Sequence, residues 1–447
     1  MQKENLGDQI EDELFDLLRT RFGGDCVYHS PKYRKINGQE KELSDVLIVS
    51  LPYVISFQSK WLSYSSDDFD SEKGKIIASR VVKRMEEGAR QHKSLKSLLL
   101  NSSSLELPLV WDEDGGTYQL PTALIKRIIP IVVMDFDDKR YDDPDSRLIL
   151  PPIVVNDTNR QSDISVVHAF MFKDLVRILC DMFTVGDLIA YLNQRSRILE
   201  RQNRFPLHFN ELTLFAVYLT KFDLFEKILQ SDFVLFLEND IYEHRMTEIN
   251  KAIQQRRELY SVRDRVDDIM LFLADNAKLE RSTNVSLEAV ATRYVTCLSR
   301  LKCFGSMFKR MISDAIEYCW TRVVVNNEQS HFSYIINAET NISGQAIIVA
   351  CFDVESREFV ENSVRIQEWS LRRLMTAIKG EQTRSDIVEV LMIIFNRNKE
   401  KIMMRVHQLE AEDYDLTLSE SEAMNQRKIM TRGNYHLEEW SFLKSNK

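Results

Sequence analysis

The chain has 447 residues, of which 44% are hydrophobic and 28% are charged, and its formal net charge is −9 at pH 7. This composition is typical of a soluble globular protein, and the length predicts two or three domains with real cores. The acidic total disfavours a protein that coats nucleic acid over its whole surface. No apolar run approaches the roughly 20 residues that are needed to span a bilayer.

The N-terminus and the cysteines predict a cytoplasmic protein with no membrane partner. Residues 1–5 lack the apolar stretch of a signal peptide. The six cysteines are scattered, without a Cys-x-x-Cys pair and without a histidine pair at zinc-binding spacing. We therefore expect reduced thiols in protein cores.

The first predicted element is an amphipathic helix at residues 8–22, where apolar residues recur at helical spacing. Glu11 falls inside the apolar stripe of this helix. A carboxylate in such a place is costly unless it is paired or bound to a metal ion. Pairing with a lysine or with backbone amides is the alternative to metal binding, and the helix alone does not decide between them.

A strand near residues 26–29 and then a hairpin follow the helix. Residues 44–49 form a buried apolar run and residues 53–61 a second one, with Leu51-Pro52 between them as the turn. These runs predict two neighbouring strands of a sheet.

The hairpin carries the residues with the clearest chemistry. Asp45 begins the first strand, and Gln58, Ser59 and Lys60 lie in the second. Because side chains alternate along a strand, we expect Gln58 and Lys60 on one face and Ser59 on the other. An acid on one strand, with an amide and a lysine on its partner, is an arrangement that holds a divalent cation and an attacking water. A strand-end acid and an exposed lysine are the structural alternative.

A long helix over about residues 75–100 and a strand at 128–134 complete this region, and residues 164–168 are a candidate for one more strand of the same sheet. Basic residues greatly outnumber acidic ones between positions 73 and 96, a local exception in an acidic chain. Such clusters contact phosphates. The candidates for nucleic-acid contact are Lys75, Lys83, Arg84 and Gln91, and a solvated basic helix face is the alternative for each.

Glu11, Asp45 and the Gln58-x-Lys60 pair, in this order of elements, resemble the PD-(D/E)XK, or restriction-endonuclease-like, nuclease superfamily. Glutamine in place of the commoner glutamate resembles the Mrr-like branch. The resemblance is confined to about the first 160 residues. It implies a mixed sheet flanked by helices and an endonuclease that uses Mg²⁺ or Mn²⁺, with DNA as its substrate.

The resemblance also implies a role for each matching residue. Asp45 binds the metal, the Gln58 amide oxygen and the Ser59 carbonyl lie beside it, and Glu11 reaches it directly or through a water. Lys60 orients the attacking water and counters charge on the phosphate. The neutral Gln58 departs from the commoner pattern: it lowers the negative charge of the site, is expected to weaken metal binding, and leaves open a slow or inactive domain.

Residues 161–328 predict a helical accessory region. Its amphipathic segments are 172–183, 185–199, 211–229, 240–273 and 287–319. Arg195 is expected on a charged helix face, with phosphate contact as the alternative. His168 has no partner at catalytic spacing and is expected to be structural or exposed.

Residues 329–447 predict a small α+β region of unknown role. Strands are expected at 332–336 and 345–351, and helices at 363–378 and 384–408. The region shows no catalytic constellation, so a sensor, a partner-binding module or an oligomerisation module are all compatible with it. The partner would be a regulatory protein, a small-molecule activator or a second copy of the chain.

The expected fold class is thus an α/β restriction-endonuclease-like core at 1–160, followed by the mostly α-helical region and the α+β region. The expected function is a divalent-metal-dependent endonuclease that hydrolyses DNA, with a bacterial defence or restriction role compatible with its accessory regions. The alternatives are a catalytically inactive nuclease-fold scaffold that binds DNA or a partner, and a helical interaction protein whose first domain matches by chance.

Overall fold

The computed structural model describes the following residues: 6–34, 40–62, 81, 83–92, 95, 104–108, 117–136, 167–202, 211–220, 246–261, 266, 269–270, 272–273, 294, 296–336, 345–380 and 389–409. The chain forms two compact units. The N-terminal unit comprises residues 1–262 and 272–307, and the C-terminal unit comprises residues 263–271 and 308–447. None of the helices in the described residues combines the length and the apolar character needed to cross a membrane.

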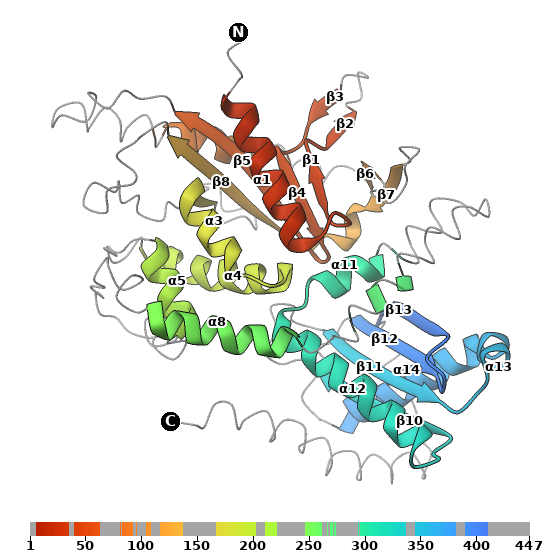
Figure 1. Ribbon diagram of the computed structural model, residues 1–447. Coiled ribbons are helices and arrows are strands. Elements are labelled where there is room, and N and C mark those ends of the chain that lie inside the picture. The colour runs from red at the N-terminus through yellow and green to blue at the C-terminus, as the bar shows by residue number, and fades with distance from the viewer. Residues whose placement is uncertain are drawn as a thin grey trace, which may run out of the picture. The chain divides into compact units, whose positions relative to one another are not determined.

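A five-stranded mixed sheet is the centre of the N-terminal unit, in the order β1-β4-β5-β8-β9 (Figure 1). Its strands are β1 (Val27–His29), β4 (Val46–Ser50), β5 (Tyr53–Leu62), β8 (Arg127–Phe136) and β9 (His168–Met171). The β1–β4 and β4–β5 pairs are antiparallel, and the β5–β8 and β8–β9 pairs are parallel. The α/β class with a mixed sheet is therefore confirmed, and the runs at 26–29, 44–49, 53–61 and 128–134 each contain a strand. Of the candidate strand 164–168, residues 164–166 lie outside the described residues, and β9 begins at His168.

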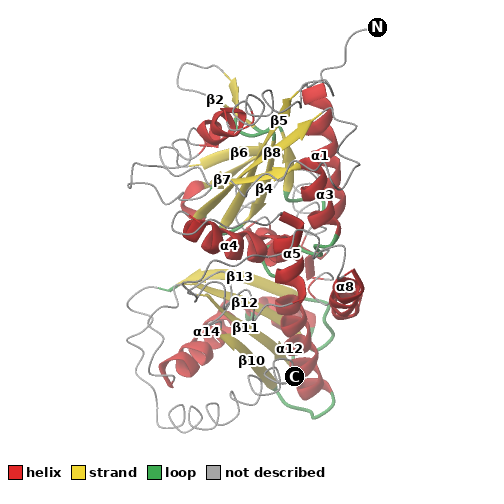
Figure 2. Cartoon of the chain, turned by 90° about the vertical axis from the view of Figure 1, so that its left-hand side faces the viewer, coloured by secondary structure: helices red, strands yellow, loops and turns green. Residues whose placement is uncertain are grey.

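One face of the sheet is covered by α1 (Leu6–Phe22) and α3 (Phe172–Cys180), which contact β5 and β8 respectively. Figure 2 shows these two helices together on one side of the sheet. Leu14 and Leu18 of α1 are fully buried. Their spacing of four residues places them on the same helix face, which is why the apolar period of this segment produces a docked helix.

The opposite face of the sheet is covered by the helical residues 83–92. Met85 lies in one buried cluster with Val132 and Met134 of β8. A Cβ atom at Gly88 would lie 2.8 Å from a methyl carbon of Val132, so glycine allows this helix to approach the sheet closely. The remainder of the helix predicted over residues 75–100 lies outside the described residues, apart from 81 and 95.

Two small antiparallel strand pairs flank the sheet. β2 (Lys32–Arg34) pairs with β3 (Glu40–Glu42), and β6 (Ser104–Pro108) pairs with β7 (Thr117–Pro121). The apolar residues of β6 and β7 pack with Leu47 of β4. The short 3₁₀ helix η2 (Thr122–Leu124) leads from β7 towards β8.

Further helices complete the N-terminal unit: α4 (Val185–Gln202), α5 (Glu211–Thr220), α8 (Met246–Ser261) and α11 (Thr296–Lys302). The amphipathic segment 287–319 is divided between two helices, because α11 ends at Lys302 and α12 begins only at Ser306. A Cβ atom at Gly186 would lie 2.2 Å from the carbonyl carbon of Phe304. The turn between α11 and α12 therefore packs directly against the backbone of α4, and only glycine leaves room for this contact.

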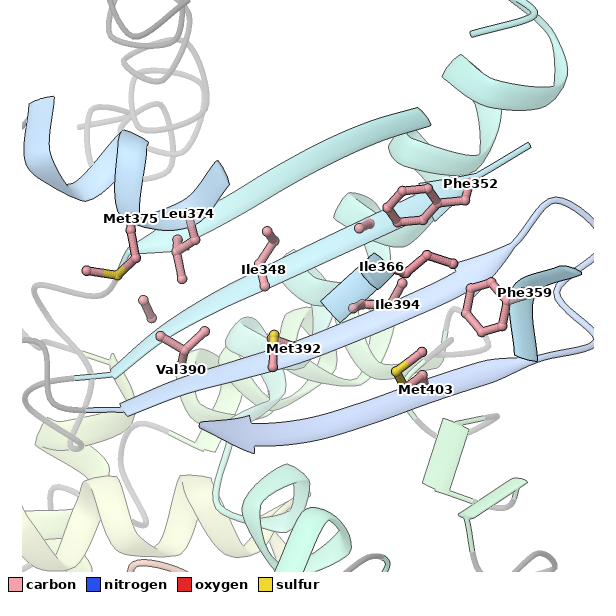
Figure 3. Close-up of a cluster of buried hydrophobic side chains, with 12 residues drawn as sticks. Ile348, Phe352, Phe359, Ile366, Leu374, Met375, Val390, Met392, Ile394 and Met403 are labelled. Carbon is pink, nitrogen blue, oxygen red and sulfur yellow. The ribbon is translucent and has the colours of Figure 1, made fainter. Parts of the chain in front are cut away.

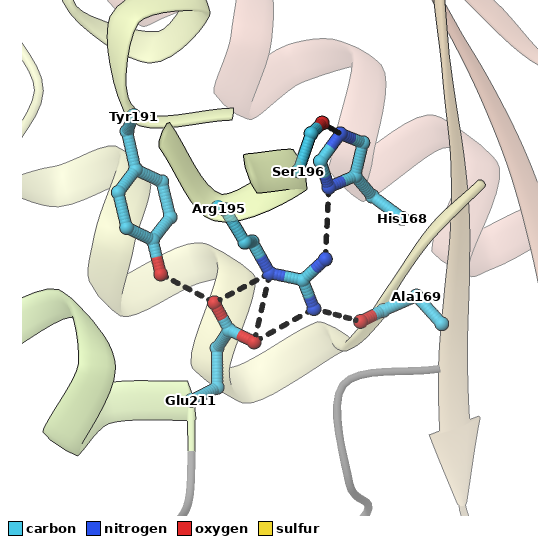
Figure 4. Close-up of polar contacts among 6 residues, drawn as sticks. All are labelled: His168, Ala169, Tyr191, Arg195, Ser196 and Glu211. Carbon is cyan, nitrogen blue, oxygen red and sulfur yellow. Dashed lines mark hydrogen bonds and ion pairs between the residues drawn. The ribbon is translucent and has the colours of Figure 1, made fainter. Parts of the chain in front are cut away.

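Arg195 does not lie on a charged helix face, and that expectation is wrong. Its side chain is fully buried, and its guanidinium donates to both carboxylate oxygens of Glu211, at 2.8–3.1 Å (Figure 4). Nη2 also donates to the carbonyl of Ala169, at 3.0 Å. The reason is that α5 carries a buried acid that pairs with this arginine across the tertiary structure, which the period of α4 alone does not reveal.

His168 belongs to the same network and is structural. Its Nδ1 accepts a 2.8 Å hydrogen bond from Arg195, so the ring is neutral and carries its proton on Nε2, which donates to Ser196 Oγ at 3.2 Å. The Tyr191 hydroxyl donates to the Glu211 carboxylate. Every charged group of this cluster is therefore bound by a neighbour.

The C-terminal unit is a four-stranded sheet in the order β10-β11-β12-β13. Its strands are β10 (Ser330–Ile336), β11 (Gln345–Phe352), β12 (Glu389–Asn396) and β13 (Ile402–Gln408). The β11–β12 pair is parallel and the two outer pairs are antiparallel. The helices are α12 (Ser306–Val324), α13 (Ser356–Glu361) and α14 (Ser363–Gly380), and Figure 3 shows the apolar core that α13 and α14 form with one face of the sheet.

The helix expected over 384–408 is wrong, because the described part of this range forms β12 and β13. Residues 390–395 are an unbroken apolar run, and all of them are buried. A strand that is covered on both faces needs such a run, whereas a surface helix needs an apolar period. Lys399, with φ of 57°, lies in the turn that connects the two strands.

The two units differ from the expected boundaries at residues 160 and 328. β9 follows residue 160 and still belongs to the first sheet, because His168 pairs with Ile131 of β8. The C-terminal unit begins at residue 308, within α12. The six cysteines are free thiols, and all except Cys180 are buried, as the sequence indicates.

Candidate metal centre

Asp45 lies where β4 begins, and the backbone there is irregular. The amide of Asp45 donates to the carbonyl of Phe57, while the strand register also pairs Val46 with Phe57. Two residues that face one across an antiparallel pair form a β-bulge, which redirects a side chain at the end of a ladder. Asp45 is only 7% exposed.

Ser59 of β5 holds this carboxylate. Its backbone amide donates to Asp45 Oδ2 at 2.5 Å, and its hydroxyl lies 2.8 Å from the same oxygen. The hydroxyl also lies 3.2 Å from Glu11 Oε1. A hydroxyl has a single proton to donate, so the Ser59 hydroxyl can donate to only one of the two carboxylates at a time, whereas its amide always faces Asp45. The sequence predicted a role only for the carbonyl of Ser59, and the structure adds its amide and hydroxyl.

A third carboxylate, that of Glu42 in β3, joins this pair. Oxygen atoms of Glu11, Glu42 and Asp45 all lie within 4.8 Å of one another. Burial and, next, the charge of Asp45 raise the pKa of Glu11 from its ordinary value of 4.5 to about 7, although the Ser59 hydrogen bond opposes this. The same two causes raise the pKa of Glu42. Like charges thus accumulate here, in a place where a cation would relieve them.

Lys60 adjoins the carboxylates through the backbone. Its Nζ donates to the Ser59 carbonyl at 2.8 Å, the oxygen that the resemblance places near a metal ion. Strand alternation directs the Lys60 stem and Gln58 towards the face that residues 83–92 cover, away from the face that Ser59 shares with α1. The Lys60 ammonium nevertheless bends back to the backbone of β5, where it meets the carbonyl of Ser59, the residue that binds Asp45.

Gln58 was also expected to be a ligand, but among the described residues no hydrogen bond links it to the carboxylates. Its side chain is 4% exposed. Among the described residues, no donor lies within hydrogen-bonding distance of Gln58 Oε1. A buried amide oxygen without a donor is unfavourable. Its side chain points to the sheet face that residues 83–92 cover, opposite Ser59, so the structure does not bring Gln58 together with Glu11 and Asp45.

The donor set fits a hard divalent cation. Carboxylates and a backbone carbonyl are the oxygen ligands that Mg²⁺ and Mn²⁺ take, and there is no thiol or imidazole in the group. Glu11, Glu42 and Asp45 are therefore the residues that could hold the ion, with the Ser59 carbonyl and Lys60 beside them.

His92 is a buried residue of the neighbouring helix that the sequence did not single out. Its Nε2 donates to the carbonyl of Ile131 at 3.1 Å, so its Nδ1 accepts from the hydroxyl of Ser56. Burial lowers its pKa from 6.5 to about 3. It is a neutral structural histidine that ties residues 83–92 to β5 and β8.

The candidates for nucleic-acid contact lie on this helix. Lys83, Arg84 and Gln91 are exposed, and Arg84 pairs with Glu87 at 2.7 Å. Lys75 lies outside the described residues. An exposed pair of this kind is weak, so Arg84 is available to a phosphate.

Glu42 was missed because its strand has no apolar period to interpret. It precedes Asp45 by three residues, in a run that reads as a charged loop. Only the pairing of β3 with β2 and the bulge at Asp45 bring it to the site. No protein-family model matches this chain, and neither a curated protein nor a solved structure matches it.

Proposed function

We propose that the chain is a divalent-metal-dependent endonuclease that hydrolyses phosphodiester bonds of DNA, with its active site at the junction of α1, β4 and β5. The observation that carries the proposal is the meeting of the Glu11 and Asp45 carboxylates at Ser59, with the Lys60 ammonium on the carbonyl of the same residue. The order of elements, α1, β1, β4, β5, a helix and then a parallel strand β8, supports the resemblance to PD-(D/E)XK nucleases.

Each residue has a part in this proposal. Asp45 and Glu11 bind the ion, with the Ser59 carbonyl as a further oxygen ligand. When bound, Mg²⁺ or Mn²⁺ polarises the phosphate and makes a bound water more acidic. Lys60 orients the attacking water and offsets the charge that develops on the phosphate oxygens. Ser59 keeps the Asp45 carboxylate in place through its amide.

DNA as the substrate rests on two supports. Lys83, Arg84 and Gln91 present exposed donors on the helix that packs over β5 and β8. Contacts of this type bind the phosphate backbone and position a duplex without reading its sequence. The resemblance to Mrr-like enzymes favours DNA and a restriction or defence role.

The test is cleavage of plasmid DNA by the purified full chain with Mg²⁺ or Mn²⁺. Asp45→Asn and Lys60→Gln are each expected to lower the rate by at least about a hundredfold, since each removes charge from the site of reaction. Asp16→Asn, which removes an exposed acid of α1, is the matched control and should cut normally. EDTA should stop cleavage.

Cleavage that persists in EDTA, or that survives Asp45→Asn, would refute the proposal. A wild-type chain that binds DNA and never cuts it would favour the inactive scaffold. Circular dichroism of each variant distinguishes a lost site from a lost fold.

A further inference from the structure

The β2–β3 pair lies beside the candidate metal centre, and backbone hydrogen bonds fix its base. The amide of Ser30, two residues before β2, donates to the carbonyl of Asp45 at 2.8 Å. The amide of Leu43, directly after β3, donates to the carbonyl of Pro31 at 2.7 Å. A side chain at this base is therefore positioned by strand pairing, which places a functional group more precisely than a loop does.

Lys32 is the basic residue at the base of this pair. The strand register places it directly across from Glu42. Side chains of such a pair lie on the same face, with Cβ atoms about 4.5–5.5 Å apart. The Glu42 carboxylate lies within 4.8 Å of the carboxylates of Glu11 and Asp45. The Lys32 side chain thus begins next to the cluster, on the side where Glu42 is exposed.

No neighbour in the described part of the chain binds the Lys32 ammonium. Lys32 is exposed, and it forms no ion pair with Glu42 although the two face each other across the ladder. Burial and, next, the charge of Asp45 raise the pKa of Glu42, while a hydrogen bond from Ser30 and the charge of Lys32 oppose the rise. The charge of Lys32 therefore acts on the cluster without being fixed to it.

Two other basic side chains near the cluster are already held by the protein. Lys60 Nζ donates to the Ser59 carbonyl at 2.8 Å. His29 Nε2 lies 3.5 Å from Asp12 Oδ1. Lys32 differs from both, because its ammonium is available to an anion from solution.

An extended polyanion needs a cation at this place. Three carboxylates repel a phosphate, and a bound ion offsets that repulsion only where it touches the substrate. Each DNA strand carries one negative charge for about every 3.4 Å of helix axis. A strand with one phosphate at the ion thus brings its next phosphates past the exposed carboxylate of Glu42. A lysine ammonium, a compact charge with three donors, suits such a phosphate.

We propose that Lys32 binds a backbone phosphate of the DNA next to the one that is cut, and that the β2–β3 pair forms one side of the DNA-binding face. The inference rests on the proposed function and adds a substrate-binding residue from a strand pair outside the five-stranded sheet. Lys32 acts here in binding, since a neighbouring phosphate keeps its charge throughout the reaction.

The experiment measures binding of a fluorescent DNA duplex to the full chain by anisotropy, in EDTA and over a series of salt concentrations. Lys32→Gln should weaken binding by about three- to tenfold and lower the slope of log affinity against log salt by about 0.9, the value for one phosphate contact. Lys32→Arg should restore both. Lys126→Gln is the matched control: Lys126 is also exposed, but its amide bonds Pro52, at the opposite end of the β4–β5 hairpin.

Two further measurements separate DNA binding from an effect on the metal centre. With Mg²⁺, Lys32→Gln should raise KM for cleavage and change kcat by less than about twofold, because the contact is equal in the ground and transition states. Calorimetric titration of Mn²⁺ should give an affinity within about twofold of the wild type. A changed Mn²⁺ affinity with an unchanged salt slope would mean that Lys32 acts only on Glu42, and would overturn the inference.

The remaining outcomes distinguish this inference from the proposed function. If the wild type binds and cuts DNA, and Lys32→Gln or Lys126→Gln has the same salt slope as the other, the function stands and the role of Lys32 is refuted. A wild-type chain that binds no DNA refutes the function and the inference together. Urea unfolding in EDTA verifies that each variant is folded.

Discussion

Arg195 and Glu11 are both charged residues on the inward side of helices in the N-terminal unit, and their surroundings are opposite. Arg195 faces the Glu211 carboxylate, a neutral histidine and a carbonyl, all within 3.1 Å. Glu11 faces Asp45 and Glu42, which have its own charge. One cluster has its charges neutralised within the protein, and the other accumulates negative charge.

The difference distinguishes a structural from a functional polar cluster. A buried ion pair with all its hydrogen bonds made is self-sufficient, and it fixes how α4 and α5 pack against β9. A group of like charges weakens the fold until a ligand neutralises it, and such groups concentrate at functional sites. The comparison therefore predicts opposite responses to mutation and to pH.

The largest expected effect is at the neutralised cluster. Arg195→Met should lower the free energy of unfolding by about 3–5 kcal/mol, because it leaves Glu211 buried without its partner. Arg197, exposed on the same helix, is the matched control, and Arg197→Met should change stability by no more than about 0.5 kcal/mol. Urea unfolding measures both. Equal losses in the two variants would mean that the network adds nothing to the fold.

The next effect is the response of this cluster to acid. Burial, and next the charge of Arg195, hold the pKa of His168 well below its ordinary 6.5. As pH falls, His168 is therefore protonated in the unfolded chain before it is protonated in the folded chain. The stability that neutral His168 contributes is lost as pH falls below 6.5. The slope can reach about 1.4 kcal/mol per pH unit. His168→Asn should flatten the profile below pH 6.5, and an unchanged slope would exclude His168 as its source.

The smallest effect has the opposite sign and belongs to the acidic cluster. The pKa of Glu11 is raised from 4.5 to about 7, so the folded chain holds this proton more tightly than the unfolded chain. The stability that protonated Glu11 contributes is fully present below pH 4.5 and is lost as pH rises towards 7. In EDTA, Glu11→Gln should therefore stabilise the chain at pH 8 and not at pH 4. Because Glu11 is partly exposed, the gain should stay below about 1 kcal/mol. A loss of stability at pH 8 would mean that Glu11 is a paired structural acid.

The sequence by itself determined the strands of the first sheet and the inward position of Glu11. β4, β5 and β8 are short apolar runs bounded by turn residues, which favour buried strands, and α1 has a clear helical period. The order of Asp45, Gln58 and Lys60 along the hairpin was likewise visible. These features are local, because they depend on residues a few positions apart.

Only the tertiary structure decided which charges meet. The partner of Arg195 is 16 residues away on another helix, Ser59 reaches Glu11 across 48 residues, and Glu42 arrives on a separate strand pair. The 390–395 run became a strand because β11 and β13 flank it, although its length also allowed a helix. Periodicity shows which side of an element is apolar, whereas the partner of a buried charge depends on how distant segments pack.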